Sequence, residues 1–368
     1  MQCFSARGLF LALILLFCSS QSLAHKLDTH GGITLIGQAG RDSRVRPGIT
    51  ASVDLELTLQ RGRGEWFLWL EGSTTVQPWQ TSAILVETNA DARTTLTRKN
   101  KGRLQVSNFG YSFPLWRHTV SIGLLDASSI LDSSRIANDE TRQFVSTTLV
   151  NNPVIGFPDY TLGMLIRKKS GHQRLGYTMF LGLGHGLRDT PERSYRALFD
   201  LDAREKGVFA ALEIDGKKHL SRLDLHYHFG LWSNTAAHRY LSQTGSAANY
   251  GLYTVLETKL GRLDLSSRLG VANRRVAQAA EFVSLALRYR RGRNTIGLGA
   301  SWTGLSGHGR QPGQGDRLQA ELYYRHDFNK HFSVTPSIQW VQNSSFDSSN
   351  ALFDQDQVIV GIRLQAAF

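Results

Sequence analysis

The stretch ITASVDLELTLQ, residues 49–60, alternates apolar and polar side chains from end to end. Its apolar members, from Ile49 to Leu59, share one face of an extended strand, and its polar members, from Thr50 to Gln60, share the other. A tilted strand needs about ten residues to cross a bilayer, so the length also fits. The stretch therefore predicts a membrane-crossing strand with one face toward lipid and the other toward water.

The same alternation returns in residues 220–231 and 261–271, where apolar side chains face one side and charged ones recur on the other. A soluble β-sandwich also alternates, but its strands are usually shorter, about 5–6 residues. The long runs favour an all-β fold, a transmembrane antiparallel β-barrel of about sixteen strands, with fourteen and eighteen as alternatives. Candidate strands lie near residues 49–60, 65–73, 81–89, 103–113, 117–125, 160–168, 174–183, 206–215, 219–231, 249–258, 261–271, 281–290, 294–303, 316–326, 330–341 and 357–368.

The connections between these candidates alternate between tight and long. Glycine-containing turns such as 61–64, 215–218, 259–261 and 291–294 are tight, which is typical of β-hairpins. The connections at 126–159, 184–205 and 304–316 are long. Outer-membrane barrels show this asymmetry, with short periplasmic turns and long external loops.

The last strand carries an apolar stripe that ends on the aromatic residue Phe368. This tail resembles the signal by which the barrel-assembly machinery recognises its clients, so that machinery is an expected partner and Phe368 the expected assembly signal. The stripe consists of Val358, Val360, Ile362, Leu364, Ala366 and Phe368.

The amino-terminal residues have the features of an export signal. Arg7 precedes an apolar run at residues 9–17, and Ser22-Leu23-Ala24 offers the small-x-small pattern of a cleavage site. The run is too short for a membrane-spanning helix, and Phe17 stands where lipoprotein processing at Cys18 wants a small residue. We expect a signal peptide at 1–24, an N-terminal segment at 25–48 and a barrel at 49–368 in the outer membrane of a Gram-negative cell. Cys3 and Cys18 both fall in the signal, so no thiol would remain.

The chain carries 42 basic and 30 acidic residues, a formal net charge of +12. Such an excess favours acidic partners. The basic residues are spread over the whole length without a zinc-finger or helix-turn-helix pattern, so nucleic acid is not expected. Outer-membrane lipid and the phosphates of lipopolysaccharide explain the charge equally well, as does a lumen that attracts anions.

The segment from Gly123 to Pro153 carries three short motifs in order: Gly123-Leu124-Leu125-Asp126, then Ala137-Asn138-Asp139-Glu140 with Gln143-Phe144, then Asn151-Asn152-Pro153. This order resembles the core of the OprB-type carbohydrate-selective porins, over about 30 residues. The resemblance implies a sixteen-stranded pore that passes sugars by diffusion and is narrowed by an inward-folded segment.

Residues 128–148 are too long for a turn and have helix-compatible spacing, with Ile136, Glu140, Phe144 and Thr147 near one face. If this segment folds into the lumen, Ile136 and Phe144 would be buried against the wall. A solvated surface loop is the alternative that the residues themselves leave open. With the resemblance, we expect a pore constriction formed by Arg135, Asn138, Asp139, Glu140, Arg142 and Gln143.

Strand parity places a set of charged side chains on the polar face of the barrel wall. An arginine-rich lumen would favour neutral or anionic solutes over cations. The expected pore-lining residues are Arg222, Asp224, Arg262, Arg268, Arg288, Arg325 and Arg363.

No arrangement in the sequence indicates an enzyme. His226 and His228 share one strand face, but no third metal ligand is identifiable, so we expect no metal and no cofactor. A phospholipase or protease would need a Ser–His or paired-carboxylate arrangement that the sequence does not display. We therefore predict an outer-membrane porin for passive diffusion of carbohydrates, as a monomer or a homotrimer. The alternatives are a porin for other small or anionic solutes and, with least support, a barrel enzyme or an adhesin.

Overall fold

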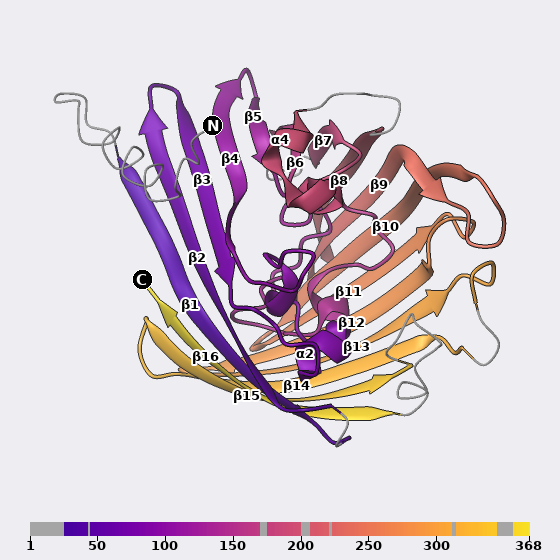
Figure 1. The fold of residues 1–368 in the computed structure, drawn as a ribbon. Helices are drawn as coiled ribbons and strands as arrows, with labels where there is room; N and C mark the ends of the chain where they lie inside the picture. Colours follow the sequence, from indigo (N-terminus) through magenta and orange to yellow (C-terminus); the bar gives the residue numbers. More distant parts are fainter. Residues whose placement is uncertain are drawn as a thin grey trace, which may run out of the picture.

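The computed structural model describes residues 26–42, 45–169, 175–199, 207–220, 223–310, 314–343 and 356–368. Within them, sixteen antiparallel strands follow one another around a closed barrel, and β1 pairs with β16 to complete it (Figure 1). The predicted all-β barrel of about sixteen strands is confirmed. The strands are β1 (Leu27–Gly40), β2 (Gly48–Arg61), β3 (Gly64–Ser73), β4 (Leu104–Leu115), β5 (His118–Leu125), β6 (Thr161–Lys168), β7 (Gly176–Leu183), β8 (Val208–Leu220), β9 (Leu223–Arg239), β10 (Ser246–Leu260), β11 (Leu263–Ala272), β12 (Ala279–Arg291), β13 (Asn294–Leu305), β14 (Arg317–Asp327), β15 (Phe332–Gln342) and β16 (Gln357–Ala367).

Helices are few and short. In the described part of the chain, no helix has the length and the apolar character that would let it cross a membrane. The helical turns are α2 (Thr81–Ile84), η1 (Val86–Thr88), η2 (Asp91–Arg93), α3 (Thr147–Val150), η3 (Leu187–Asp189), η4 (Pro191–Arg193) and α4 (Tyr195–Leu198).

The barrel wall is apolar outside and polar inside, the reverse of a water-soluble protein. In β2, Ile49 and Val53 are exposed on the outer surface, whereas Thr50 and Ser52 are buried inside. The alternation predicted for residues 49–60 is therefore confirmed. The outward apolar face fits a lipid environment, where side chains gain by leaving water and every backbone group must find a partner within the ladder.

Two strand predictions differ from the structure. One candidate strand is absent from the described residues, and one strand that is present was not among the sixteen candidates, so the number of strands described is still sixteen. Residues 81–89 form α2 and η1 instead of a strand, because their apolar side chains are consecutive and Leu85 packs inside the barrel on Val341 and Ile359. The sequence assigns residues 25–48 to a segment before the barrel and offers a strand at 31–39 only as an alternative, yet Leu27–Gly40 is β1. Its pattern is weak because Gly31 and Gly32 interrupt the alternation. The predicted signal peptide at 1–24 lies outside the described residues.

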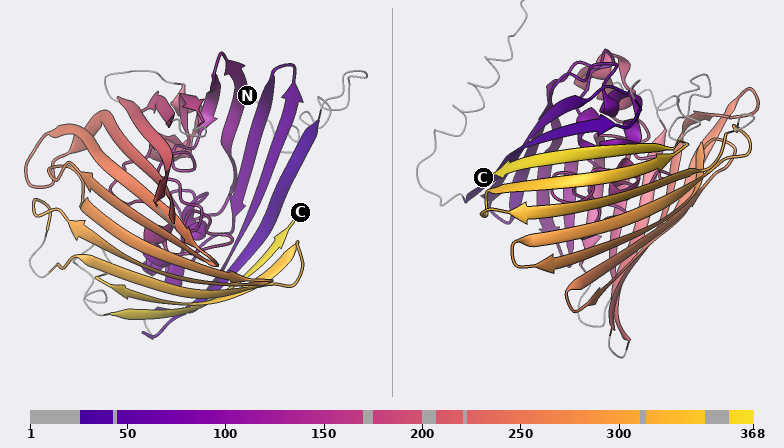
Figure 2. Two further views of the ribbon diagram at one scale, coloured as in Figure 1. Left: turned by 180° about the vertical axis from the view of Figure 1, so that it is seen from behind. Right: turned by 90° about the horizontal axis from the view of Figure 1, so that it is seen from below.

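Three long connections bend toward the barrel axis instead of away from it. They are residues 74–103 between β3 and β4, 126–160 between β5 and β6, and 184–207 between β7 and β8, described up to residue 199. The first two fill much of the interior, as the purple and magenta segments within the ring of strands in Figures 1 and 2 show. The lumen is therefore narrowed by the chain itself.

The third connection extends the barrel wall at the place where its strands are shortest. Strands β5, β6 and β7 have only eight residues each, so the ladder between β4 and β5 stops at Phe109–Leu124. Beyond that point the Tyr195 hydroxyl donates to the Val106 carbonyl at 2.8 Å and accepts from the Val106 N–H at 2.7 Å. Tyr195 thus satisfies backbone groups that would otherwise form an unpaired strand edge.

The two ends of the described chain meet where the barrel closes. Strand β1 pairs with β16 over Gly32–Gly40, and the Phe368 N–H donates to the Gly31 carbonyl at 2.9 Å while the Gly31 N–H donates to the Phe368 carbonyl at 3.2 Å. A Cβ on Gly31 would lie 2.7 Å from the Phe368 ring, so only glycine leaves room for the terminal aromatic. The last residue is therefore part of the closing seam.

Deleting Phe368 is expected to reduce insertion of the barrel, because it removes this pair of backbone hydrogen bonds and the terminal aromatic. Molecules that do insert should keep an unaltered single-channel conductance. The folded fraction in membranes, measured by heat-modifiable gel mobility, checks the first point, with Phe368→Tyr as the control that keeps the ring and the backbone. Normal insertion of the deletion variant would contradict the role of Phe368.

Candidate functional site

The connection at 126–160 crosses the lumen and packs against apolar side chains of the opposite barrel wall. Ile136 and Phe144 are fully buried, as the sequence predicted, and pack with Leu149 against Tyr323. The Phe144 and Tyr323 rings meet edge to face with centroids 5.0 Å apart. Gly299 makes this possible, because a Cβ there would lie 2.6 Å from Leu149 and 2.9 Å from Phe144. We call residues 126–160 the constriction loop.

Two buried wall arginines hold the backbone of the constriction loop. Arg363 of β16 donates from Nη1 to the Glu140 carbonyl at 2.6 Å and from Nη2 to the Gln143 carbonyl at 2.8 Å. Arg268 of β11 donates from Nη1 to the carbonyls of Leu149 and Val150, both at 3.0 Å. Guanidinium groups suit this task because their planar fork can satisfy two acceptors at once.

Wall carboxylates hold the loop's N–H groups in the same way. Glu257 of β10 accepts from the Arg135 N–H at 2.9 Å and from the Ser134 hydroxyl at 2.9 Å. Glu321 of β14 accepts from the N–H groups of Val145 and Ser146 at 3.0 and 2.8 Å. Backbone groups inside a barrel need partners like any others, and here charged wall residues supply them.

The connection at 74–103 is fixed by β1 and β15, which flank the β16 strand that carries Arg363, and it contacts the constriction loop. The side-chain amides of Gln38 and Gln339 both donate to the Thr88 carbonyl, at 2.8 and 2.9 Å. The Ala90 N–H donates to the Val145 carbonyl at 2.8 Å and so ties the two connections together. The narrowing of the lumen is therefore built from two segments, of which the sequence predicted only one.

Three of the predicted constriction residues maintain the loop's own shape. Asp139 Oδ1 accepts from the N–H groups of Thr141 and Arg142, both at 3.0 Å. The Asn138 N–H donates to Gln143 Oε1 at 2.8 Å, and Gln143 Nε2 donates to the Arg135 carbonyl at 3.0 Å. The side chains of Asp139 and Gln143 are thus occupied within the loop. Asn138 Oδ1 accepts from the Ser134 N–H at 3.0 Å and from Arg268 of the wall, and Asn138 also lines the large cavity described below.

The other three predicted constriction residues are open to the lumen. Arg142 is exposed, and Arg135 is more than half exposed although its Nε also donates to Glu257 at 2.9 Å. Glu140 lines the large cavity described below. The helix that the spacing of Ile136, Glu140 and Phe144 suggested is absent from the described loop before α3, because the wall contacts determine its path residue by residue.

The predicted pore-lining residues divide into three groups. Arg268 and Arg363 point inward but are consumed in holding the loop, and Arg288 donates to the Arg135 carbonyl at 3.0 Å while pairing with Asp264. Others lie at the tight-turn rim: Arg262 is exposed in the β10–β11 turn, Asp224 accepts from His219 at 2.7 Å, and Arg325 pairs with Asp327 at 2.7 Å. Arg222 lies outside the described residues.

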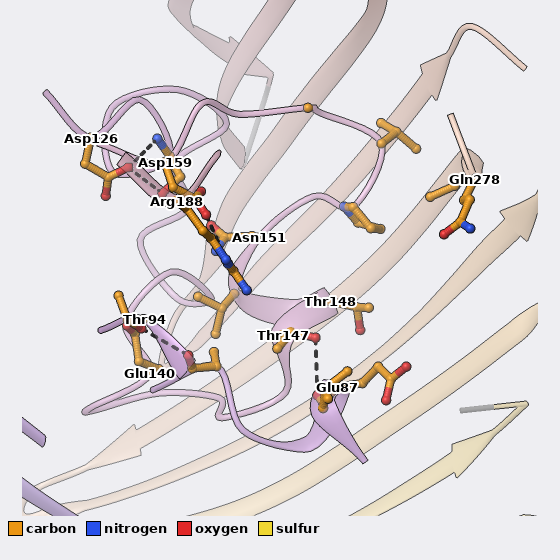
Figure 3. A pocket seen from close by; sticks show the side chains of 18 of the residues that line it. Glu87, Thr94, Asp126, Glu140, Thr147, Thr148, Asn151, Asp159, Arg188 and Gln278 are labelled. Atoms are coloured by element: carbon orange, nitrogen blue, oxygen red, sulfur yellow. Dashed lines mark hydrogen bonds and ion pairs between the residues drawn. The ribbon is translucent and has the colours of Figure 1, made fainter. Parts of the chain in front are cut away.

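A cavity of about 900 Å³ lies between the three inward connections and the wall (Figure 3). Its size falls within the range of small-molecule sites, about 300–1,000 Å³. Arg188 reaches into it and pairs with Asp159 at 3.0 Å, and Trp69 and Tyr160 contribute aromatic surface. Its ionisable lining, in the described residues, comprises Glu71, Glu87, Asp126, Glu140, Asp159, Arg188, His238 and Arg317.

Carboxylates outnumber arginines in this lining, which differs from the arginine-rich lumen that strand parity predicted. Arg317 is itself paired with Glu87 at 2.9 Å. Burial raises the pKa of Asp126 to about 6. Burial also raises the pKa of Asp159, against the opposing effect of Arg188. The charge of the cavity therefore depends on pH near neutrality.

Sequence reasoning missed Arg188, Asp159 and the connection at 74–103, and it did not assign Glu257 to the site. Strand parity already placed Glu257 on the polar face of β10, so an inward carboxylate was within reach of that pattern. No periodic signal marks the segments at 74–103 and 184–199, because their positions depend on contacts with strands far away in the sequence.

A family model described as "Carbohydrate-selective porin, OprB family" matches residues 204–368, just under half of the chain. The predicted OprB-type resemblance is thereby confirmed, although the match lies beyond the motifs at 123–153. A protein of Aquifex aeolicus (strain VF5), described only as uncharacterized, is 29% identical over 146 residues, 37% of this chain and 46% of that protein. The aligned part thus spans about half the length of that relative.

Solved porin structures share the fold. OprB of Pseudomonas putida, in its high-pH structure, superposes with a TM-score of 0.71 at 13% identity, covering 94% of both chains. OmpT of Vibrio cholerae, in its trimer form, superposes with a TM-score of 0.58 at 12% identity, covering 94% of this chain and all of that one. At these identities the likeness concerns the fold alone.

Replacing Arg363 with Met should loosen the constriction loop, because it removes two charge-assisted hydrogen bonds to the loop backbone, each worth about 1.5–3 kcal/mol. We expect a higher and noisier single-channel conductance in barrels that still fold. Arg325→Met is the matched control on the same wall, since its guanidinium bonds Asp327 and Gln365 instead of the loop backbone. Equal conductance in the two variants would show that Arg363 does not hold the loop.

Proposed function

We propose that this chain is an OprB-type outer-membrane porin through which carbohydrates diffuse passively. The observation that carries the proposal is the cavity of about 900 Å³ enclosed by immobilised connections within a closed sixteen-stranded barrel. The family match over residues 204–368 supports the same function.

The cavity has the chemistry that sugars need. Sugar hydroxyls are recognised by carboxylate, amide and guanidinium groups, and sugar C–H faces pack on aromatic rings. Arg188 and Asp159, both labelled in Figure 3, supply a hydrogen-bond donor and an acceptor at the cavity wall and are joined at 3.0 Å. Asn151 and Tyr160 add hydrogen-bonding groups, and Trp69 an aromatic surface.

The narrowest part of the path is assigned to the exposed loop side chains Arg135 and Arg142, with Glu140 at the cavity side. Asp139 and Gln143 act on the path indirectly, by keeping the loop folded, and Asn138 does so while also lining the cavity. Arg268, Arg288 and Arg363 likewise position the loop and leave little charge free for solutes. This division of roles follows from the hydrogen bonds described above.

Within this proposal, residues 1–24 direct export. The tight turns lie on the periplasmic side of the membrane, and the long connections start from the extracellular end of the barrel. Both ends of the described chain lie on the tight-turn side, since Lys26 and Phe368 are within the rim formed by the β2–β3 turn and the closing seam. Expected partners are sugars or other small solutes, surrounding lipid and lipopolysaccharide, and the barrel-assembly machinery.

The alternatives are weaker on specific grounds. The porin family and fold favour a channel over an enzyme or an adhesin. A porin for anionic solutes would need positive charge along the whole path, whereas Arg135 and Arg142 supply it only at the loop and the described cavity lining holds more carboxylates than arginines. A neutral sugar faces no such barrier.

Replacing Arg188 with Met should weaken block of the ion current by a monosaccharide such as glucose by about tenfold or more, because a charged hydrogen-bond donor in the cavity is worth about 1.5–3 kcal/mol. Titration of single-channel current with the sugar measures this. The control is Arg196→Met, an exposed arginine in the same connection that does not line the cavity. Identical block in wild type and Arg188→Met would remove the cavity from the sugar path.

Ion selectivity should depend on pH. A carboxyl group whose pKa is raised to about 6 loses its proton as pH rises through that value, so the cavity gains negative charge between about pH 5 and about pH 8. Reversal potentials in a potassium chloride gradient should shift toward cation preference over this interval. Asp126→Asn should flatten the change. A preference for anions at every pH would favour the anionic-solute alternative instead.

A further inference from the structure

Six exposed basic residues gather on three neighbouring tight turns. They come from the turns between β10 and β11, between β12 and β13, and between β14 and β15. The orange and yellow hairpins in the right panel of Figure 2 place these turns along the rim that also carries the C-terminus. We call this set the basic turn cluster: Lys259, Arg262, Arg290, Arg291, Arg293 and Lys330.

The three turns are joined by hydrogen bonds, so the cluster is one continuous surface. The Arg290 N–H donates to the Arg262 carbonyl at 3.3 Å. On the other side, the Asp327 N–H donates to the Arg293 carbonyl at 2.9 Å, and Arg293 Nη1 donates to the Phe328 carbonyl at 2.9 Å. Neighbouring turns therefore hold their positive charges at a common level.

Nearby acidic groups do not neutralise the cluster. Asp264 is paired with Arg288 at 2.9 Å, and Asp327 with Arg325 at 2.7 Å, so both are used by arginines outside the cluster. Among the described residues, no member of the cluster forms an ion pair. The positive charge of this rim is free for an external partner.

A band of aromatic side chains lies directly beside the cluster on the outer surface. Tyr289, Tyr324, Phe328 and Phe332 are each 38–50% exposed, and the Phe328 and Phe332 rings are 5.6 Å apart. Aromatic residues collect where a membrane barrel meets the lipid headgroups. Arg291, on the same strand face as Tyr289, and the turn residues Arg262, Arg293 and Lys330 therefore stand at headgroup level, whereas Lys259 and Arg290 follow the inner-face parity of Glu257 and Arg288.

We propose that the basic turn cluster binds the phosphate headgroups of anionic phospholipids in the leaflet that the tight turns face. The proposal rests on the proposed function only in that the barrel must lie in a membrane. Arginine binds phosphate oxygens in bidentate fashion, and several cations on adjacent turns can share one or two headgroups. The aromatic band favours a lipid over a soluble ligand, because it keeps the acyl chains beside the same turns.

The test compares two full-length variants with equal charge loss. One carries Arg262→Gln, Arg290→Gln, Arg291→Gln and Arg293→Gln. The other carries Arg61→Gln, Arg63→Gln, Lys217→Gln and Lys218→Gln, which lie in or beside the β2–β3 turn and near the β8–β9 turn elsewhere on the rim. Each protein is placed in bilayers of phosphatidylglycerol and phosphatidylethanolamine, extracted with detergent, and examined by native mass spectrometry for retained phosphatidylglycerol.

The cluster variant should retain phosphatidylglycerol about tenfold less than wild type or weaker still, since each basic residue near an anionic surface contributes to binding. The control variant should retain it within about twofold of wild type. Equal loss in both variants, or no loss in either, overturns the proposal. Displacement of the lipid by inorganic phosphate, but not by sodium chloride of the same ionic strength, would show a site for free phosphate and also overturn it.

Two further measurements separate this inference from the porin proposal. Heat-modifiable gel mobility must show that both variants fold, and a variant that does not fold is replaced by the pair Arg290→Gln and Arg291→Gln, compared with Lys217→Gln and Lys218→Gln. Sugar flux is measured in the same preparations. A wild-type protein that retains phosphatidylglycerol but passes no sugar contradicts the porin proposal alone, and normal flux without selective lipid retention contradicts this inference alone.

Discussion

Closure of the sheet is the constraint on which the rest of this structure depends. In a hydrocarbon environment an open strand edge would leave N–H and C=O groups without partners, so a membrane sheet must return to its first strand. Here the seam between β1 and β16 completes the ring, and its last pair involves Gly31 and Phe368. Once the ring is closed, alternate residues of every strand must point into a shared interior.

Alternate residues of each strand face the lipid and the interior, so the polar half of the alternating pattern points inward. Several of these inward charged side chains bind the backbone of the constriction loop. Arg268, Arg363, Glu257 and Glu321 hold the backbone of the constriction loop from the far side of the barrel. Charge-assisted hydrogen bonds in a partly dry interior are strong, and removing one partner leaves the other buried and unsatisfied. The loop is therefore held as firmly as an element of the sheet, and the solute meets a fixed chamber.

Because inward charges are bound to the loop, the net positive charge of the chain does not predict the charge of the lumen. An excess of arginine and lysine in the sequence suggests a positively charged lumen, but the inward arginines are largely consumed by loop carbonyls, and the cavity is richer in carboxylates. Unpaired positive charge stands on the tight turns, beside aromatic side chains at the membrane boundary, as well as on Arg142 of the constriction loop. The partners proposed above for the two places differ accordingly, a neutral solute for the interior and lipid phosphate for the rim.

The barrel could be predicted from the amino-acid sequence alone, since alternation with period two over runs of about ten residues has few other interpretations. It also indicated that Ile136 and Phe144 would be buried by an inward loop. It could not decide that residues 81–89 turn as a helix while Leu27–Gly40 forms a strand, because short apolar runs suit either and glycines weaken the pattern. Which inward charges remain free depends on contacts that form only in the folded barrel. Parity tells that Arg363 points inward, but its partners are carbonyls 220 and 223 residues away along the chain, and only the closed barrel brings them together.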